Sequence, residues 1–255
     1  MSNSLFSLAG STALITGSSR GLGLSIAKGL AEAGARIVLN GINADRLRAS
    51  ALSLRAMGFD VHEAPFDVTD EPAILAAFAR LDAEGTAVDI LVNNAGIQLR
   101  KPMVDLTTAE WQTVLDANLT SAFVIGREAG KRMILRGRGK IINIGSLTSQ
   151  LARATVAPYT VAKGGIKMLT QAMAAEWAEF GIQANAIGPG YMLTDMNQAL
   201  VDNSQFDAWV KARTPAKRWG KPEELIGTAV FLASDASAYV NGQIIYVDGG
   251  MSSVL

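Results

Sequence analysis

Tyr159 and Lys163 are the two residues of this sequence whose types and spacing are best suited to chemistry. They stand four positions apart in the stretch APYTVAKGG, which reads as helical, so their side chains project from one face, one turn apart. A free tyrosine titrates near ~10, and a close ammonium lowers the pKa of the phenol toward neutrality. The pair could therefore act as an acid–base group, although the same spacing also arises by chance on many helix surfaces.

Ser146 lies upstream of this pair, where the branched apolar run Ile141–Ile144 ends. The run predicts a buried strand that ends near Gly145, and Ser146 would stand at its mouth. From there its hydroxyl could hydrogen-bond the same reacting oxygen as the phenol. The stretch from Ile141 to Gly165 is therefore the candidate catalytic region.

The composition narrows the chemistry, because the 255 residues include no Cys and one His. The absence of Cys excludes disulfides, thiolate zinc sites and a cysteine nucleophile. A Ser-His-Asp triad would need His62, whose place in the alternating stretch FDVHEAPF predicts a structural or surface role. We therefore expect no metal and assign proton transfer to Tyr, Lys, Asp or Glu.

Charge and hydropathy argue against nucleic-acid and membrane partners. The formal net charge is zero, so nothing indicates a polyanion partner. One local basic cluster is best interpreted as a solvated helix end and loop; it comprises Lys131, Arg132, Arg136, Arg138 and Lys140. No apolar run approaches the ~20 residues of a membrane helix, and MSNSLFSLAG is too polar for a signal peptide, so we expect a cytoplasmic location.

Short β-branched runs alternate with longer amphipathic stretches along the whole chain. This alternation predicts an α/β fold: a doubly wound, Rossmann-type parallel sheet of about seven strands with helices on both faces, in a single domain of residues 1–255. The expected strands are Ala13–Thr16, Arg36–Leu39, Asp60–Pro65, Ile90–Asn93, Lys140–Ile144, Gln183–Ile187 and Gln243–Val247. The expected helices are Leu22–Ala33, Ala44–Met57, Glu71–Ala83, Thr108–Leu135, Tyr159–Phe180 and Pro222–Leu232.

Residues 191–220 break this rhythm, because they contain two short helical patterns and no strand. An insertion after the carboxyl end of a strand is where open sheets place the loops that cover ligands. Long connections in compact domains are usually functional, so we predict a substrate lid over about 191–220. The alternative is a helical hairpin that only packs on the body.

The stretch TGSSRGLG, residues 16–23, follows the first strand and opens the first helix. Its spacing is G-x-x-x-G-x-G, and glycines let the backbone turn tightly and approach a pyrophosphate at the helix N-terminus. The alternative is a tight turn that binds nothing. The residues expected to contact a dinucleotide here are Gly17, Ser19, Arg20, Gly21, Leu22 and Gly23.

The end of the second strand bears on the choice of coenzyme. NAD-binding units usually place Asp or Glu there to hold the ribose hydroxyls, whereas this chain has Asn40 and Gly41. Nothing acidic would repel a 2′-phosphate and Arg20 could attract one, so NADP(H) is favoured and NAD(H) stays an alternative. Asp67, after the third strand, could accept a hydrogen bond from the adenine amine or could cap the following helix.

Several motifs occur together in one order: TGSSRGLG, Asn93-Asn94-Ala95-Gly96, Asn118, Ser146, Tyr159, Lys163 and Pro189-Gly190. On these residues the chain resembles the short-chain dehydrogenase/reductase family from Leu8 to Gly250. The resemblance implies an NAD(P)-dependent oxidoreductase in which the coenzyme supplies the hydride. It also implies coenzyme contacts from Asn40, Asp67, Val68, Asn94, Ala95, Gly96, Tyr159, Lys163, Pro189, Gly190 and Thr194.

The same resemblance implies a role for each catalytic residue. Tyr159 would exchange a proton with the substrate oxygen, and Ser146 would orient and polarise that oxygen. Lys163 would bind the nicotinamide ribose and lower the pKa of Tyr159. Asn118 would hold a water that connects Lys163 to solvent, although a mid-helix Asn can also simply bond a local carbonyl.

Within the family, the local sequence is most similar to gluconate 5-dehydrogenases, at LFSL, GIQ, LAR, APY, GPGY, RTPAKRWG and VDGGM. This similarity implies reversible oxidation of D-gluconate to 5-keto-D-gluconate by a homotetramer. A sugar acid needs a cation for its carboxylate, and a guanidinium pairs with a carboxylate through two hydrogen bonds. The expected substrate contacts are Gln98, Arg100, Ser146, Gln150, Arg153, Tyr159, Tyr191 and Trp219.

Two other functions compete with this interpretation. A 3-oxoacyl carrier-protein reductase, or another carbonyl reductase, would use the same chemistry but would need an apolar or pantetheine channel. A cofactor-binding regulatory protein would need the fold alone. The complete set of Asn118, Ser146, Tyr159 and Lys163 argues for an enzyme, because binding alone does not require a proton donor.

Overall fold

The computed structural model describes residues 4–254, and its central feature is one parallel sheet of seven strands. The strands lie in the order β3-β2-β1-β4-β5-β6-β7, and every neighbouring pair is parallel. Their bounds are β1 Thr12–Ile15, β2 Arg36–Gly41, β3 Val61–Pro65, β4 Ile90–Asn93, β5 Gly139–Ile144, β6 Ile182–Pro189 and β7 Ile244–Val247. All the predicted strands are thus confirmed, with ends that differ by one or two residues.

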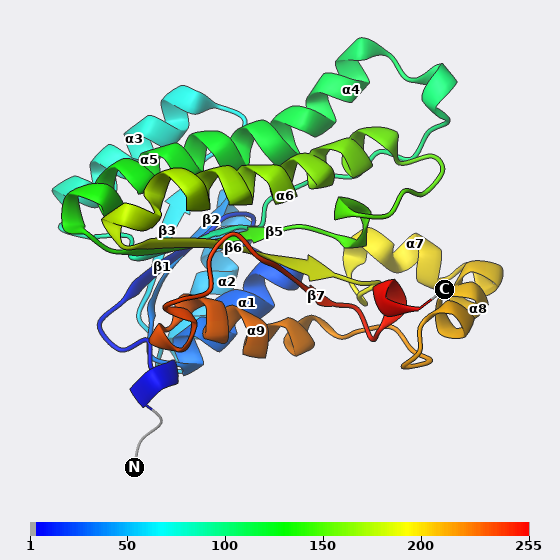
Figure 1. Ribbon diagram of the computed structural model, residues 1–255. Helices are drawn as coiled ribbons and strands as arrows, with labels where there is room; N and C mark the ends of the chain where they lie inside the picture. Colours follow the sequence, from blue (N-terminus) through cyan, green and yellow to red (C-terminus); the bar gives the residue numbers. More distant parts are fainter. Residues whose placement is uncertain (1–3, 255) are drawn as a thin grey trace.

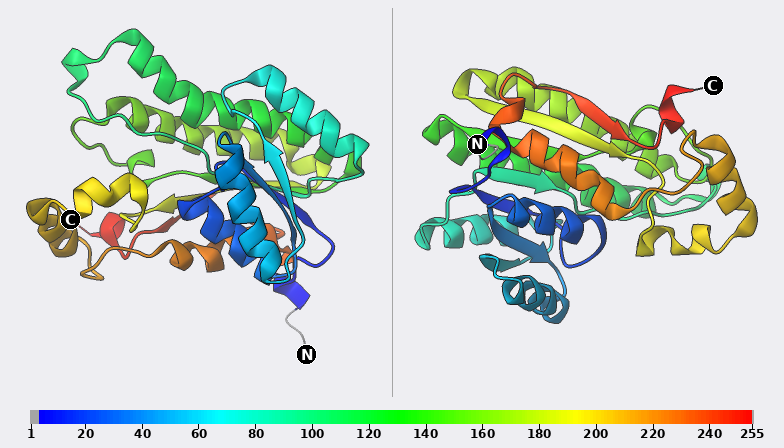
Figure 2. Two further views of the ribbon diagram at one scale, coloured as in Figure 1. Left: turned by 180° about the vertical axis from the view of Figure 1, so that it is seen from behind. Right: turned by 90° about the horizontal axis from the view of Figure 1, so that it is seen from below.

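Helices cover both faces of the sheet, as predicted for a Rossmann-type fold (Figure 1). On one face lie α1 (Gly21–Glu32), α2 (Ala44–Ala56) and α9 (Ile226–Ala233); on the other lie α3 (Glu71–Ala83), α5 (Ser121–Arg136) and α6 (Ala157–Trp177). Figure 2 shows α1 and α9 side by side when the molecule is seen from below. The strands pack against both helical layers, because successive side chains point to opposite faces of the sheet. Ile15 packs with α1, whereas Leu14 packs with α3 and α5.

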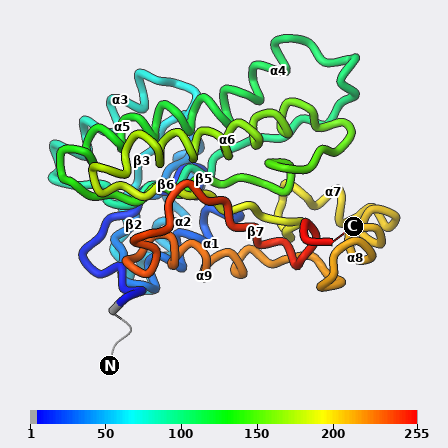
Figure 3. The backbone as a smooth tube through the Cα atoms, in the orientation of Figure 1, coloured from blue at the N-terminus to red at the C-terminus, as the bar shows by residue number. Residues whose placement is uncertain are grey.

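The order of the strands reverses beside β1, which lies between β2 and β4. The chain runs outward from β1 through β2 to β3 and then returns to β4. Figure 3 traces the backbone in colours that run along the sequence from blue to red. Loops that leave neighbouring strands in opposite directions open a crevice at the carboxyl ends of those strands, where open α/β sheets bind ligands. The TGSSRGLG loop and the Asn94–Gly96 turn both lie at this crevice.

The predicted helix over residues 108–135 is confirmed, but it contains a π-helical turn that was not predicted. The structure divides it into α4 (Thr108–Leu115), a π-helical turn (Asp116–Thr120) and α5. A π-turn adds a residue to one helical turn and is common at functional sites. Hydrophobic periodicity cannot reveal such a turn, because the apolar stripe continues through it. Asn118 lies within it and is buried.

The 191–220 insertion contains the short helices η6 (Asp195–Asn197), α7 (Gln198–Val201) and α8 (Ser204–Arg213). In Figure 1 these helices, coloured yellow to brown, lie beyond the carboxyl ends of β6 and β7, near the C-terminus. The two ends of the insertion pair with each other through Met192 and Gly220. A separate apolar cluster of Leu147, Val210, Trp219 and Met251 fastens the insertion to the body. In the part of the chain that the structure describes, no helix is long and apolar enough to cross a membrane.

Candidate active site

Ser146, Tyr159 and Lys163 converge at the carboxyl end of β5. Ser146 follows the strand directly, and its Oγ accepts a hydrogen bond of 3.1 Å from the Thr148 N–H, which fixes the direction of the hydroxyl. Tyr159 and Lys163 lie on the first turns of α6, which begins with Pro158 near its first helical position. The three side chains predicted from the sequence to act together are therefore brought together.

Lys163 is 3% exposed, and its Nζ donates a hydrogen bond of 2.7 Å to the Ile144 carbonyl at the end of β5. This bond ties the catalytic helix to the strand that carries Ser146. The ammonium lies 5.5 Å from the centroid of the Tyr159 ring. Burial lowers the pKa of Lys163 to about 8, because desolvation disfavours the charged form.

The pKa of Tyr159 moves in the opposite direction from the one expected. Burial of the phenol raises its pKa, and the Ser146 hydroxyl and the Arg100 charge offset this only in part. Desolvation penalises the phenolate here more than the nearby charges favour it. The phenol is therefore protonated at neutral pH and can donate its proton.

Asn118 presents an unpaired acceptor toward Lys163. Its Nδ2 donates to the Ile97 carbonyl at 2.9 Å and to the Val114 carbonyl at 2.8 Å, while its buried Oδ1 has no partner in residues 4–254. A methyl group added at Gly96 would overlap this Oδ1 and would lie 3.9 Å from Lys163 Nζ. The acceptor and the ammonium thus both lie near the position that a Cβ at Gly96 would take, and a water that bridges them stays a prediction.

The glycine loop is held against the turn that follows β4. The Thr16 Oγ1 accepts hydrogen bonds of 3.0 Å from the N–H groups of Asn94 and Ala95, and the Asn94 amide donates to the carbonyls of Thr16 and Gly17. Gly17 has φ +60°, and a Cβ there would lie 2.9 Å from the Ala95 Cα. Only glycine fits this approach, so the loop geometry requires it.

The start of α1 fits the phosphates of a dinucleotide. Arg20 precedes the helix in an extended conformation and forms no side-chain cap, so side chains do not occupy the first N–H groups. Gly23 in the first turn packs against the Gly17 carbonyl and the Asn94 amide, which leaves no room for a larger residue. Free N–H groups and the positive end of the helix dipole favour an anion at this position.

The structure gives the Asn40 side chain another role than the predicted coenzyme contact, and of the two roles predicted for Asp67 it excludes the helix cap, while the adenine contact stays a prediction. Asn40 is 1% exposed; its Oδ1 accepts from the Gly17 N–H, and its Nδ2 donates to the carbonyls of Ala64 and Phe66. The side chain therefore holds the loop and is not available to contact a coenzyme. Asp67 does not cap α3, because Asp70 performs that role; Asp67 Oδ1 instead accepts from the N–H and hydroxyl of the residue two positions on.

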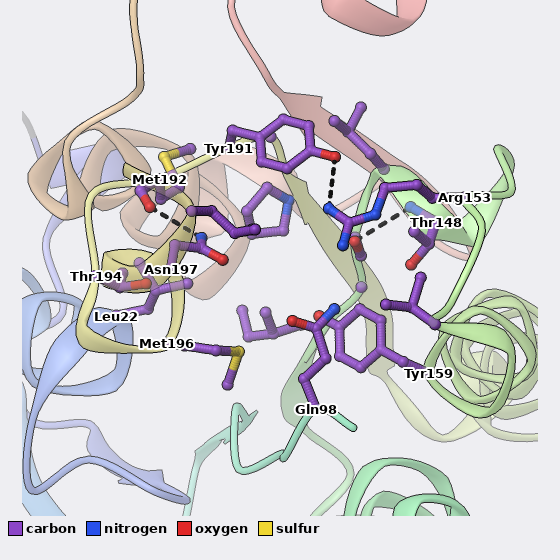
Figure 4. Close-up of a pocket in the computed structure, with 18 residues that line it drawn as sticks. Leu22, Gln98, Thr148, Arg153, Tyr159, Tyr191, Met192, Thr194, Met196 and Asn197 are labelled. Atoms are coloured by element: carbon purple, nitrogen blue, oxygen red, sulfur yellow. Dashed lines mark hydrogen bonds between the residues drawn. The ribbon is translucent and has the colours of Figure 1, made fainter. Parts of the chain in front are cut away.

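A cavity opens in front of Ser146 and Tyr159 (Figure 4). Its walls come from the loop before α4, from β5 and α6, from the end of β6 and from the insertion. Predicted site residues that line it are Leu22, Gln98, Ser146, Arg153, Tyr159, Pro189, Gly190, Tyr191 and Thr194. Segments that are far apart in the sequence thus enclose one cavity.

The Arg153 guanidinium lines this cavity, and the Arg100 guanidinium lies nearby but is not part of the lining. Arg153 Nη1 donates to the Tyr191 hydroxyl at 3.3 Å, and its guanidinium lies 5.1 Å from the Phe206 ring centroid. Arg100 Nη2 donates to the Met196 carbonyl at 3.3 Å. Burial and then the charge of Arg153 lower the pKa of Arg100, and Arg100 in turn influences Tyr159. Two like charges this close favour an anionic ligand between them.

Three predicted substrate contacts do not line the cavity: Arg100, described above, Trp219 and Gln150. The Trp219 ring is 5% exposed; its Nε1 donates to Asp207 at 2.9 Å, and it packs edge-on against Tyr191 with a centroid distance of 5.6 Å. It supports Tyr191 from behind, because its aromatic neighbours hold it in the cluster of the insertion. Gln150 is exposed at the end of the short helix after Ser146 and is not among the residues that line the cavity.

Other residues of the cavity were not predicted. Thr148, two residues after Ser146, lines it and has a buried hydroxyl without a partner in the described chain. Met196, Asn197 and Leu200 enter from the insertion. Thr148 lies in the turn that directly follows the strand and Ser146, and this position could have indicated that it lines the cavity. No periodicity in the sequence identified the three residues of the insertion. In residues 4–254, no group of three or more His, Cys, Asp or Glu side chains could hold a metal ion.

The fold and the site define a Rossmann-type oxidoreductase with a Ser-Tyr-Lys centre. A family model described as enoyl-(acyl carrier protein) reductase matches residues 17–252. The chain is 48% identical over 248 residues to a gluconate 5-dehydrogenase of Gluconobacter oxydans, with 97% of each chain covered. It belongs to the short-chain dehydrogenase/reductase family.

Solved structures agree over nearly the whole chain. One from Agrobacterium tumefaciens is 73% identical, has a TM-score of 0.98 and covers 98% of this chain and 99% of that chain. A gluconate 5-dehydrogenase from Burkholderia cenocepacia, in complex with NADP and tartrate, is 49% identical with a TM-score of 0.97 and 99% of each chain covered. The architecture described above is therefore that of known gluconate dehydrogenases.

Proposed function

We propose that the chain is an NADP(H)-preferring oxidoreductase that interconverts a secondary alcohol and a ketone on a sugar acid, namely D-gluconate and 5-keto-D-gluconate. The observation that carries this proposal is that Arg153 and the Tyr159 phenol line one cavity, with Arg100 near enough for its charge to offset in part the burial that raises the pKa of Tyr159. Two cations beside an acid–base group suit a substrate with a carboxylate and a reacting carbonyl on one short carbon chain. The relatives that are named gluconate 5-dehydrogenases support the same substrate class.

The bound coenzyme would supply the hydride, and the side chains of the site would manage the proton. In the direction of reduction, the Tyr159 phenol would give its proton to the oxygen of the ketone. Ser146 donates a hydrogen bond to the same oxygen and holds it in line. Lys163 and Asn118, which both lie near Gly96, would return a proton to Tyr159 through water.

The NADP(H) preference rests on the edge of the coenzyme crevice. No acidic side chain lies at the end of β2, where Asn40 and Gly41 are followed by the exposed Ile42. Arg20 is exposed beside the phosphate-binding loop and can pair with a 2′-phosphate. The NADP in the Burkholderia cenocepacia relative supports this choice, with NAD(H) as the weaker alternative.

The proposal includes one domain over residues 1–255, with a substrate lid at about 191–220, in a cytoplasmic homotetramer. The lid is supported by the cavity residues that this segment contributes. Exposed apolar side chains support association, notably Phe123 on α5 and Val161 and Met168 on α6. Analytical ultracentrifugation tests it: a particle of four chains is expected, and a stable monomer would contradict it.

A coenzyme-coupled panel tests the substrate. We expect the highest kcat/KM for 5-keto-D-gluconate with NADPH, and for D-gluconate in reverse, ahead of 2-dehydro-3-deoxy-D-gluconate, other keto acids and acetoacetyl thioesters. A carrier-linked substrate fits poorly, since the Arg153 guanidinium lines the cavity where an acyl chain would need an apolar channel. If the acetoacetyl thioester were the best substrate, the proposed function would be wrong.

A further inference from the structure

The insertion is tied to the body by three arginines that also belong to the proposed ligand sites. Arg153 donates to the Tyr191 hydroxyl and Arg100 to the Met196 carbonyl, each at 3.3 Å. Arg20, from the phosphate-binding loop, pairs with Asp195 at 3.1 Å. Only the Arg20–Asp195 contact joins two opposite charges. The insertion thus places the Asp195 carboxylate against the Arg20 guanidinium, which is the group that would bind a coenzyme phosphate.

Both side chains of this pair are open to solvent and free of other ties. Arg20 is 61% exposed and Asp195 is 71% exposed, and neither side chain forms another hydrogen bond or ion pair within residues 4–254. Asp195 directly follows Thr194, a residue of the cavity wall, at the start of η6. Because nothing else positions them, the two groups can exchange partners at little cost.

We propose that Asp195 is a coenzyme-specificity residue that competes with the 2′-phosphate of NADP(H) for Arg20. This inference rests on the proposed NADP(H) preference. A phosphate monoester carries up to two negative charges and pairs with a guanidinium through two hydrogen bonds. The Asp195 carboxylate occupies the same guanidinium and repels the phosphate. It therefore weakens binding of NADP(H) while leaving NAD(H) unaffected, since NAD(H) has no phosphate at that position.

The expected effect is modest, because the pair is exposed. Ion pairs between exposed side chains change an equilibrium by about one- to fivefold. Asp195→Asn should therefore tighten NADPH binding about two- to fivefold and leave NADH binding unchanged. The gain should shrink as ionic strength rises, since salt screens exposed charges. An Asp-to-Asn change keeps the size of the side chain, so the fold of the insertion should be retained.

Fluorescence titration with NADPH and with NADH tests the inference directly. The variants are Asp195→Asn, Arg20→Ala and the double variant, with Asp202→Asn as the matched control. Asp202 is an exposed carboxylate of the same insertion that accepts a hydrogen bond from Gln198 at 2.8 Å and forms no ion pair in the described chain. It controls for the change in net charge, and thermal melting of each variant reports on folding.

The inference predicts that Asp195→Asn tightens NADPH alone, that Asp202→Asn does not, and that the gain disappears when Arg20 is Ala. Equal changes for both coenzymes, no change, or a gain that survives without Arg20 would overturn it. The proposed NADP(H) preference is judged separately, by the single variant Arg20→Ala. If that variant weakened the binding of both coenzymes equally, Arg20 would not contact the 2′-phosphate. The proposed competition between Asp195 and the phosphate would then also be wrong.

Discussion

Arg153→Met tests whether the cavity recognises a carboxylate. In the structure, the Arg153 guanidinium donates to Tyr191 and lies over the Phe206 ring, at the mouth of the cavity that contains Tyr159. Methionine retains the apolar stem that covers Phe206 but has no charge or N–H donor. The change therefore removes recognition of an anion with little loss of packing.

The magnitude follows from the contact that would be lost. A hydrogen bond to a charged group contributes about 1.5–3 kcal/mol, and a factor of ten in an equilibrium constant corresponds to about 1.4 kcal/mol. The kcat/KM for D-gluconate should therefore fall roughly 10- to 150-fold. Arg100 remains as a second cation near the cavity, so we expect the lower half of this range.

The assay compares two substrates that differ in the anion. Initial rates are measured with D-gluconate and with D-glucitol, a neutral polyol of the same carbon number. Arg153→Met should lower kcat/KM for gluconate while leaving the rate with glucitol and the Kd for NADPH nearly unchanged. Arg153→Lys keeps the charge and should recover part of the gluconate activity. An unchanged ratio between gluconate and glucitol in Arg153→Met would refute the role of this cation.

Three further predictions concern the proton and the coenzyme. Tyr159→Phe should bind NADPH nearly as the wild type does but lose about 10²–10⁴ in kcat, and a variant with normal kcat would exclude Tyr159 as the acid. Arg20→Ala should raise KM for NADPH more than for NADH in parallel titrations, whereas equal effects would remove Arg20 as a phosphate contact. Because burial raises the pKa of Tyr159, the phenolate is scarce near neutrality and increases about tenfold per pH unit, so the rate of alcohol oxidation should rise with pH. The rate of ketone reduction should stay level up to about pH 8, where Lys163 titrates, and an oxidation rate independent of pH would contradict this assignment.

The sheet and the glycine loop could be predicted because local patterns determine them. Each strand is a short β-branched run between helical patterns, and the parallel order follows from the alternation itself. The catalytic pair could be predicted from helical spacing, since Tyr159 and Lys163 need only one turn of α6 to come together. Ser146 required only the end of the preceding strand. These three catalytic residues are close in the sequence, so local patterns were enough to predict that they come together.

Contacts between distant segments could not be predicted in the same way. Asn40 was expected to contact the coenzyme, but the neighbouring loop and strand take up its amide, and only the register of β2 beside β3 makes that possible. Trp219 lies behind Tyr191 because the aromatic residues of the insertion pack on one another. The pairing of Arg20 with Asp195, 175 positions apart, depends on where the insertion folds back.

The pKa of Tyr159 is raised, although the neighbouring ammonium was expected to lower it. The cause is burial of the phenol, which also favours proton donation. Burial disfavours the charged form of every titratable group, so it raises the pKa of the phenol and lowers that of Lys163 to about 8. The attraction between ammonium and phenolate was expected to dominate, but the ammonium is 5.5 Å from the ring centroid and is held by the Ile144 carbonyl. The Tyr159 phenol therefore keeps its proton near neutral pH, while the neighbouring Lys163 ammonium loses its proton more readily than a free lysine does. Such a pair can pass protons toward a substrate oxygen, and we propose that a water held by the unpaired Asn118 Oδ1 would connect Lys163 to solvent and replace them.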